Sequence, residues 1–214
     1  MTLIASVLHL DRKAIQALKI TSPYSLHRVV YSLFEDVRSE QEKQTSTSSG
    51  LLYAEQGGDY KSRKILLLSN RPPQEKVDGQ YGEVQSKAIS DSFLNHANYR
   101  FKVIVNPTKR DSASRKLVPI RGREAVHDWF AERAKTSWGF EVLPDQLQVD
   151  SINVLQFKDK NQRDITMAQA QVQGTLKVTD QQQFINSFSQ GIGRGRAFGC
   201  GLLQLVPLLE NPFV

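Results

Sequence analysis

The chain has 214 residues, of which 39% are hydrophobic and 23% charged, and this composition fits one large or two small globular domains. No apolar run approaches the ~18 residues of a membrane-spanning helix, and the first residues lack the basic region and cleavage site of a signal peptide. The single cysteine, Cys200, excludes an intramolecular disulfide framework and a multi-cysteine zinc site. We therefore expect a cytoplasmic protein without membrane contact.

The formal net charge of +6 is concentrated in one segment of the chain. Residues 98–135 contain ten basic and four acidic side chains, so the rest of the chain sums to zero. Such a concentration favours a polyanionic partner such as nucleic acid, because neutralised phosphates release counterions. The alternative is a solvated basic surface with no partner.

Local patterns predict both strands and a helix in the first half. Residues 2–10 alternate as a strand does, and Ser22-Pro23 is typical of a helix start, with a serine N-cap and proline in the first turn. Further strands are predicted at 50–54, 64–69 and 83–89. The polar residues 39–50 and the turn-forming residues 70–82 predict loops.

The second half has the order strand, helix, two strands, helix, strand. The predicted elements are a strand from Tyr99, a basic loop at 106–116, a helix at 121–135, strands at 146–157 and 165–178, a helix from Asp180 to Gly191, and a strand at 201–208. This βαββαβ order is ferredoxin-like, and the first half fits it without an evident second helix. We expect an α+β protein of two tandem ferredoxin-like domains, at residues 1–92 and 98–214.

A histidine on the first predicted helix is the best candidate for chemistry. Tyr24, His27 and Tyr31 are spaced i, i+3 and i+7, so they share one helix face, and Arg28 adjoins them. An imidazole, phenols and a guanidinium suit phosphodiester cleavage by a ribose 2′-hydroxyl, because they move protons and stabilise the phosphorane without a metal ion. Spacing alone favours the alternative, a partly buried histidine on an ordinary amphipathic helix. The four histidines lack metal-site spacing.

The segment GIGRGRAFGCG, residues 191–201, is rich in glycine. A dinucleotide-binding loop requires strand, glycines and helix in that order, whereas here the glycines follow a helix and precede a strand, so we reject that function. The glycines permit close backbone approach and unusual dihedral angles, and Arg194 and Arg196 add positive charge. A flexible turn without further function is the alternative.

The sequence KDKNQRD forms the tip of a predicted β-hairpin and carries Lys158, Lys160 and Arg163. A basic hairpin tip follows phosphates along a groove, and RNA duplexes are recognised mostly through backbone and shape. A solvated turn explains the same composition equally well.

These segments together resemble the CasE family of the RAMP superfamily, the endoribonucleases that process CRISPR repeats in type I-E systems. GIGRGRAFGCGLLQLVPL resembles the family's C-terminal glycine-rich motif and its following strand, and SPYSLHR resembles its P-Y-x-x-H-R stretch. FKVIVNPTKR, followed by VPI and HDWF, is similar to its mid-chain pattern. The matches keep the family's order and cover most of the chain, least well at residues 39–90.

The resemblance implies two ferredoxin-like domains and metal-independent cutting at the base of a CRISPR repeat hairpin, with no cofactor. His27 matches the family's catalytic histidine and Tyr24 a tyrosine used by some members, while members often have proline at Arg194. It also implies other subunits of a crRNA-guided surveillance complex as partners. The RNA contacts that we predict are Arg28, Lys109, Arg110, Arg115, Lys116, Lys158, Lys160, Arg163, Arg194 and Arg196.

A second hypothesis is an RNA-binding structural subunit of a CRISPR ribonucleoprotein that does not cut. The basic residues serve both hypotheses, whereas an imidazole beside tyrosines is needed only for cutting. A small-molecule enzyme on the same scaffold conflicts with the clustered positive charge.

Overall fold

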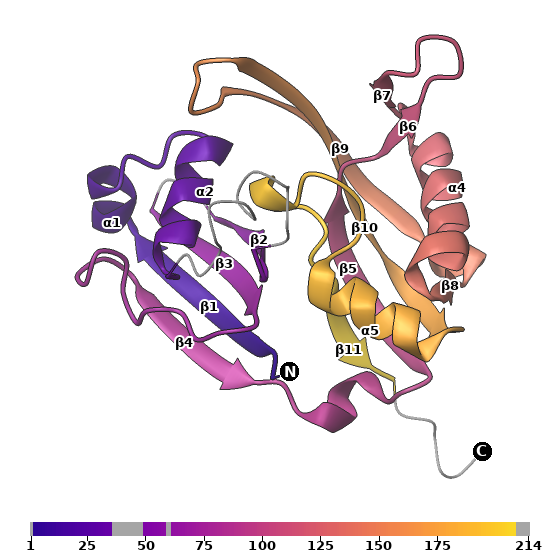
Figure 1. The fold of residues 1–214 in the computed structure, drawn as a ribbon, viewed down its shortest axis with the longest axis horizontal. Helices are drawn as coiled ribbons and strands as arrows, with labels where there is room; N and C mark the ends of the chain where they lie inside the picture. Colours follow the sequence, from indigo (N-terminus) through magenta and orange to yellow (C-terminus); the bar gives the residue numbers. More distant parts are fainter. Residues whose placement is uncertain (1, 36–48, 59–60, 209–214) are drawn as a thin grey trace.

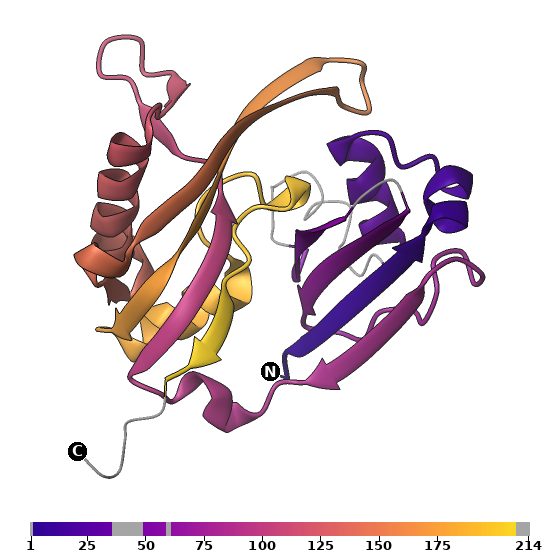
Figure 2. The ribbon, with the colours of Figure 1, turned by 180° about the vertical axis from the view of Figure 1, so that it is seen from behind.

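The computed structural model describes residues 2–35, 49–58 and 61–208. This part of the chain contains two large antiparallel sheets that follow each other along the sequence, and a small two-stranded sheet. Figures 1 and 2 show the two sheets side by side, each with helices on one face. The helices and strands are β1 (Ile4–Asp11), α1 (Arg12–Ala17), α2 (Pro23–Ser32), β2 (Leu51–Gly58), β3 (Ser62–Ser69), β4 (Glu83–Ala88), β5 (Asn98–Val105), β6 (Thr108–Arg110), β7 (Leu117–Pro119), α4 (Arg123–Arg133), β8 (Phe140–Val142), β9 (Gln148–Lys158), β10 (Asp164–Val178), α5 (Gln181–Gln190) and β11 (Gln204–Pro207). No helix in this part of the chain has the length and hydropathy of a membrane span.

The N-terminal sheet has the strand order β2-β3-β1-β4, with every neighbouring pair antiparallel. This is the ferredoxin-like order, so the predicted fold class is confirmed. The second helix that the sequence did not reveal is replaced by residues 70–82, which run as turns and place Val77 in the core. The loop predicted at 39–50 lies mostly outside the described residues, and the short helix α1 was not predicted.

Helix α2 begins where the Ser22-Pro23 signal predicted. The Ser22 hydroxyl accepts a hydrogen bond from the Ser25 backbone N–H, and the Ser25 hydroxyl accepts one from the Ser22 backbone N–H. This reciprocal capping satisfies donors that the first helical turn otherwise leaves unpaired. Leu26, Val29 and Val30 bury one side of the helix, so the opposite side is presented outward at a fixed angle.

The C-terminal sheet has the order β11-β5-β10-β8, and β9 pairs along the other half of the long strand β10. The predicted ferredoxin-like order is confirmed here too. The basic segment 106–116 differs from our prediction of a loop, because it contributes to a small hairpin of β6 and β7. Asp111 closes this hairpin by accepting hydrogen bonds from the Ser114 N–H and hydroxyl, and Arg115 adopts a left-handed φ of 58°.

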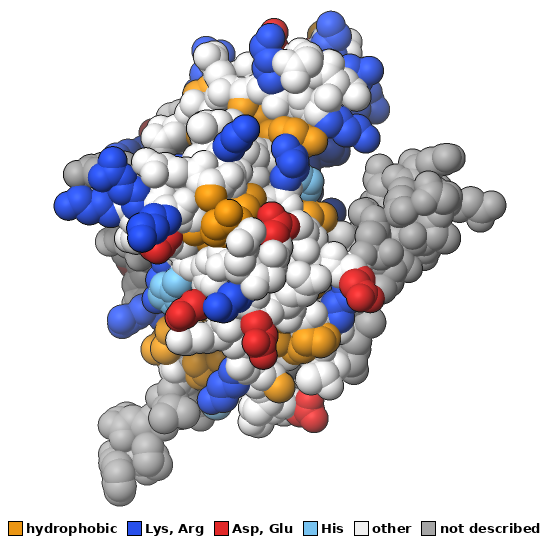
Figure 3. Space-filling model, turned by 90° about the vertical axis from the view of Figure 1, so that its left-hand side faces the viewer, with side chains coloured by type: hydrophobic (Ala, Val, Ile, Leu, Met, Phe, Trp, Pro, Cys, Tyr) orange, Lys and Arg blue, Asp and Glu red, His pale blue; other side chains and the backbone are white. Residues whose placement is uncertain are grey.

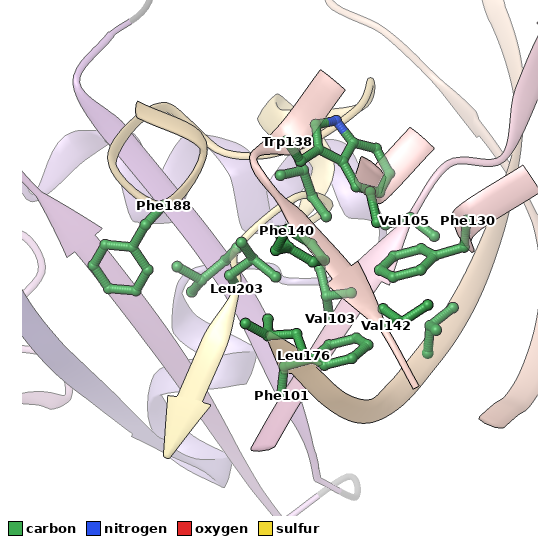
Figure 4. Close-up of a cluster of buried hydrophobic side chains, with 14 of the residues drawn as sticks. Phe101, Val103, Val105, Phe130, Trp138, Phe140, Val142, Leu176, Phe188 and Leu203 are labelled. Atoms are coloured by element: carbon green, nitrogen blue, oxygen red, sulfur yellow. The ribbon is translucent and has the colours of Figure 1, made fainter. Parts of the chain in front are cut away.

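Aromatic side chains fill the core between the C-terminal sheet and its helices (Figure 4). Phe101 on β5 and Phe130 on α4 stack with ring centroids 5.5 Å apart and an interplanar angle of 2°. The helix ends in a π-turn that buries Trp138 against Phe130. Burial of such rings is the main source of stability for this domain.

One continuous apolar cluster joins the two domains. Leu52 and Leu68 on the N-terminal sheet belong to the same buried cluster as Ile192 and Leu203 of the C-terminal domain. A Cβ atom at Gly191 would lie only 2.7 Å from the Leu52 Cδ2 atom, so glycine permits the close approach of the two chain segments. The glycine-rich segment is therefore held against the N-terminal domain.

Candidate active site

The outward side of α2 presents His27 between two tyrosine rings. The His27 ring centroid is 4.1 Å from that of Tyr31 and 6.1 Å from that of Tyr24, and the imidazole is partly exposed. The shared face that the spacing predicted is therefore present. The imidazole is neither fully buried nor fully exposed. The tyrosine rings on either side limit the orientations that it can adopt.

The glycine-rich segment reaches His27 from the other domain. Its short 3₁₀ turn η4 (Arg196–Phe198) lies beside α2 (Figure 1), and the Phe198 ring centroid is 5.7 Å from that of His27. The His27 Nδ1 atom is 2.8 Å from the Ala197 carbonyl oxygen. A carbonyl oxygen only accepts, so Nδ1 carries the hydrogen, and in the neutral ring the lone pair is on Nε2.

A pocket of about 670 Å³ lies along this side of α2. Its lining includes both tyrosines, His27 and Arg28 of α2, together with Lys19 and Asp78 from the neighbouring turns. Arg28 and Lys19 are exposed, so their charges reach solvent. The pocket thus combines an imidazole, two phenols, two cations and the carboxylate of Asp78. Among the described residues, no group of three or more His, Cys, Asp or Glu side chains is placed to hold a metal ion.

Two side chains fix the turn that carries the Ala197 carbonyl. The Tyr53 hydroxyl on β2 donates to this carbonyl at 2.9 Å, and the Gln169 amide on β10 donates to the Phe198 carbonyl at 3.1 Å. Burial raises the pKa of Tyr53 far above its ordinary value, and Tyr31, Cys200 and Glu55 raise it further. The hydroxyl therefore stays protonated and remains a donor at any physiological pH.

The basic hairpin of β9 and β10 lies on the same side of the molecule as α2. Strand β9 contacts α2, and Phe157 on β9 packs edge-on against Phe198 of η4 with centroids 4.8 Å apart. The Asp159 carboxylate accepts from the Asn161 and Arg163 N–H groups and so shapes the tip. Three cations of the tip are exposed: Lys158, Lys160 and Arg163.

Lysine and arginine side chains gather over the upper half of the face in Figure 3, and most aspartate and glutamate side chains lie lower. This face is the left side of the molecule as drawn in Figure 1, with α2 and the β9–β10 hairpin in its upper part. The upper part of this face has the charge that a polyphosphate partner requires.

The other predicted RNA-binding residues are not gathered at His27. The β6–β7 hairpin projects from the far side of β9 in Figure 1, and its four predicted cations are exposed: Lys109, Arg110, Arg115 and Lys116. The Arg110 guanidinium donates to the Arg115 carbonyl across this hairpin. Arg194 is exposed beside Asn106, whereas the Arg196 guanidinium donates to the Gln190 carbonyl at the end of α5.

Sequence reasoning missed the groups that orient His27. Tyr53 lies in the apolar run LLYA, which predicts only a buried strand, and a backbone carbonyl leaves no signature in a sequence. Phe157 and Phe198 were likewise not singled out. The glycines were the one available signal, because they predicted that this segment approaches another backbone closely.

Fold and site together define a protein of two tandem ferredoxin-like domains, with a pocket along α2 of the N-terminal domain and a basic face beside it. His27 in this pocket is hydrogen-bonded to the glycine-rich turn of the C-terminal domain. The chain belongs to the CRISPR associated protein family, whose model matches residues 3–207. This confirms the family-level prediction made from the motifs.

Named relatives are similar over nearly the whole chain. The CRISPR-associated endoribonuclease Cse3 of Thermus thermophilus is 24% identical over 200 residues, which are 88% of this chain and 92% of that protein. A structure of Thermus thermophilus Cse3 bound to an RNA representing a pre-cleavage complex has a TM-score of 0.78 at 20% identity, covering 97% of this chain and 100% of the other. A chain of a CRISPR RNA-guided surveillance complex has a TM-score of 0.69 at 20% identity, covering 96% and 100%.

Proposed function

We propose that this chain is a metal-independent endoribonuclease that cleaves CRISPR repeat hairpins in precursor crRNA. It then stays bound to the product as a subunit of a crRNA-guided surveillance complex. The similarity to Cse3, which has been solved with RNA, and to a chain of a surveillance complex supports the substrate and the partners. The basic face beside α2 supports the binding of an RNA backbone.

The observation that carries the mechanism is the hydrogen bond between His27 Nδ1 and the Ala197 carbonyl. Because Nδ1 donates there, Nε2 is the nitrogen that exchanges a proton with the RNA. Nε2 accepts the proton of the ribose 2′-hydroxyl as the 2′-oxygen attacks the adjacent phosphorus. The bond from phosphorus to the 5′-oxygen then breaks, and the leaving 5′-oxygen takes up a proton from Nε2, directly or through Tyr24. The products are a 2′,3′-cyclic phosphate and a 5′-hydroxyl.

The neighbours of His27 complete the proposed site. Tyr24 orients the scissile group or protonates the leaving oxygen, and the exposed cations Arg28 and Lys19 stabilise negative charge on the phosphorane. The β9–β10 hairpin carries Lys158, Lys160 and Arg163 along the RNA stem, which holds the scissile phosphate at the pocket.

The test compares His27→Ala with His9→Ala, which removes an exposed imidazole from β1 of the same domain. Both variants and the unmodified protein are given a labelled repeat hairpin in EDTA. We expect His27→Ala to bind RNA as well as the unmodified protein but to cut on the order of 10²–10⁴ times more slowly. His9→Ala cuts normally, and a 2′-deoxy group at the scissile position prevents cutting.

Each outcome separates the hypotheses. Unchanged cutting by His27→Ala removes this mechanism, and loss of cutting in EDTA points to a metal-dependent enzyme. An unmodified protein that binds the hairpin tightly but never cuts it is the structural RNA-binding subunit instead.

A further inference from the structure

The Tyr53 ring fills space in the core, whereas its hydroxyl is not needed for that packing. Tyr53 is 2% exposed on β2 and belongs to the core beneath α2. A phenylalanine ring would fill the same space, and a buried hydroxyl costs free energy unless it is hydrogen-bonded. This hydroxyl donates its hydrogen to the Ala197 carbonyl of the other domain. The hydroxyl of Tyr53 therefore acts on the structure through its hydrogen bond to the Ala197 carbonyl.

Two N-terminal side chains converge on this single oxygen atom. Tyr53 donates from the strand at 2.9 Å and His27 donates from the helix at 2.8 Å. The turn lies directly over the tyrosine, since a Cβ atom at Gly199 would be 3.3 Å from the Tyr53 ring. The hydrogen bond from Tyr53 thus fixes the position of the carbonyl relative to strand β2, and the hydrogen bond from His27 fixes the imidazole relative to the carbonyl.

We propose that Tyr53 is a positioning residue for RNA cleavage: its hydroxyl holds the Ala197 carbonyl where that oxygen fixes the tautomer and direction of the His27 imidazole. This inference rests on the proposed function for the reaction that it serves. Tyr53 acts through Ala197 and does not touch RNA. Tyr53 connects the N-terminal sheet to the glycine-rich turn of the C-terminal domain, and that turn contacts the imidazole of His27.

Removal of the hydroxyl takes from the carbonyl one of the two side-chain donors found among the described residues, and it gives the turn more freedom. The imidazole then samples more orientations and both neutral tautomers, so fewer molecules are aligned for proton transfer. RNA affinity stays unchanged because the basic groups are unaffected.

The experiment uses Tyr53→Phe in the full chain, with Tyr99→Phe as the matched control. Tyr99 is also fully buried, and its hydroxyl donates to the Phe93 carbonyl at 2.8 Å, within the segment that precedes β5. For Tyr53→Phe we expect a fall of about 3- to 30-fold in the single-turnover cleavage rate. The dissociation constant for a non-cleavable 2′-deoxy hairpin stays the same, and Tyr99→Phe cuts at the normal rate.

The second readout is the ¹⁵N spectrum of the His27 ring in the RNA-free protein, assigned by its loss in His27→Ala. We expect the Nδ1–H form to dominate in the unmodified protein and in Tyr99→Phe, and to lose population in Tyr53→Phe. This measurement needs no cleavage, so it tests the positioning role even if the chain proves not to be a nuclease.

The proposal is overturned if the His27 tautomer is unchanged in Tyr53→Phe. It is also overturned if Tyr99→Phe slows cleavage as much as Tyr53→Phe, because a general loss of stability then explains both. The protein could show the expected loss of the Nδ1–H form in Tyr53→Phe and yet never cut repeat RNA. In that case Tyr53 still orients His27, and only the proposed function is rejected.

Discussion

Gly199 offers a sharp test of how the turn positions the imidazole. Its φ is 80°, in the left-handed region, and a Cβ atom there would be 3.3 Å from the Tyr53 ring. Tyr53 is packed in the core and has little room to move, so in Gly199→Ala the turn shifts by a few tenths of an ångström. That shift changes the alignment of the Ala197 carbonyl with His27.

Gly193 provides the matched control for the backbone. Its φ is 68°, and nothing lies within 4 Å of a Cβ atom built there. An alanine in the left-handed region costs about 1–2 kcal/mol, and the reduced freedom of the unfolded chain returns about 0.4–1 kcal/mol of this. Each variant should therefore lose roughly 1 kcal/mol of stability.

The cleavage rate separates the two variants. A misplacement of about 1 Å costs about 10²-fold in rate, so a shift of a few tenths of an ångström predicts a fall of about 3- to 10-fold for Gly199→Ala. Gly193→Ala is expected to cut normally. Urea unfolding measures the stability and single-turnover cleavage measures the rate. Equal rates for the two variants at equal stability would refute the reasoning that contact with Tyr53 holds the turn in register with His27.

Three further predictions concern the hairpin, the core and the buried thiol. Replacement of Lys158, Lys160 and Arg163 by alanine should lower the slope of log Kd against log salt by about 2–3, and an unchanged slope would show that they do not contact phosphates. Phe130→Ala should cost about 3–5 kcal/mol in urea unfolding, whereas less than about 1 kcal/mol would contradict the stacked core. Burial raises the pKa of Cys200 to about 12 from 9.0, so its contribution to stability is complete below pH 9 and is lost as pH rises toward 12. Cys200→Ala should therefore flatten the alkaline loss of stability, and an identical alkaline profile would contradict this linkage.

The sequence predicted the parts of the fold that depend on local signals. The serine cap and the proline placed the start of α2, and helical spacing put Tyr24 and His27 on one face. The order of strands and helices in residues 98–207 predicted the C-terminal sheet, because each element there has a clear period and turn residues at its ends.

Features that depend on tertiary contacts could not be predicted. No residue pattern shows that the Ala197 carbonyl would face His27, since that pairing requires both domains to be folded and docked. The β6–β7 hairpin lies in a polar, basic segment whose composition is typical of a loop, and it forms because Asp111 and the left-handed Arg115 close its turn. The turn-forming composition of residues 70–82 predicted a loop there, but it gave no sign that Val77 would lie in the core.

The hydrogen bond between His27 and Ala197 joins groups that are 170 positions apart. A ribosome makes α2 early and the glycine-rich turn near the end of synthesis. A nascent chain therefore exposes the imidazole long before the carbonyl that aims it exists. Under the proposed function, cleavage activity is therefore acquired late in synthesis, because an incomplete chain carries the histidine without the carbonyl that orients it.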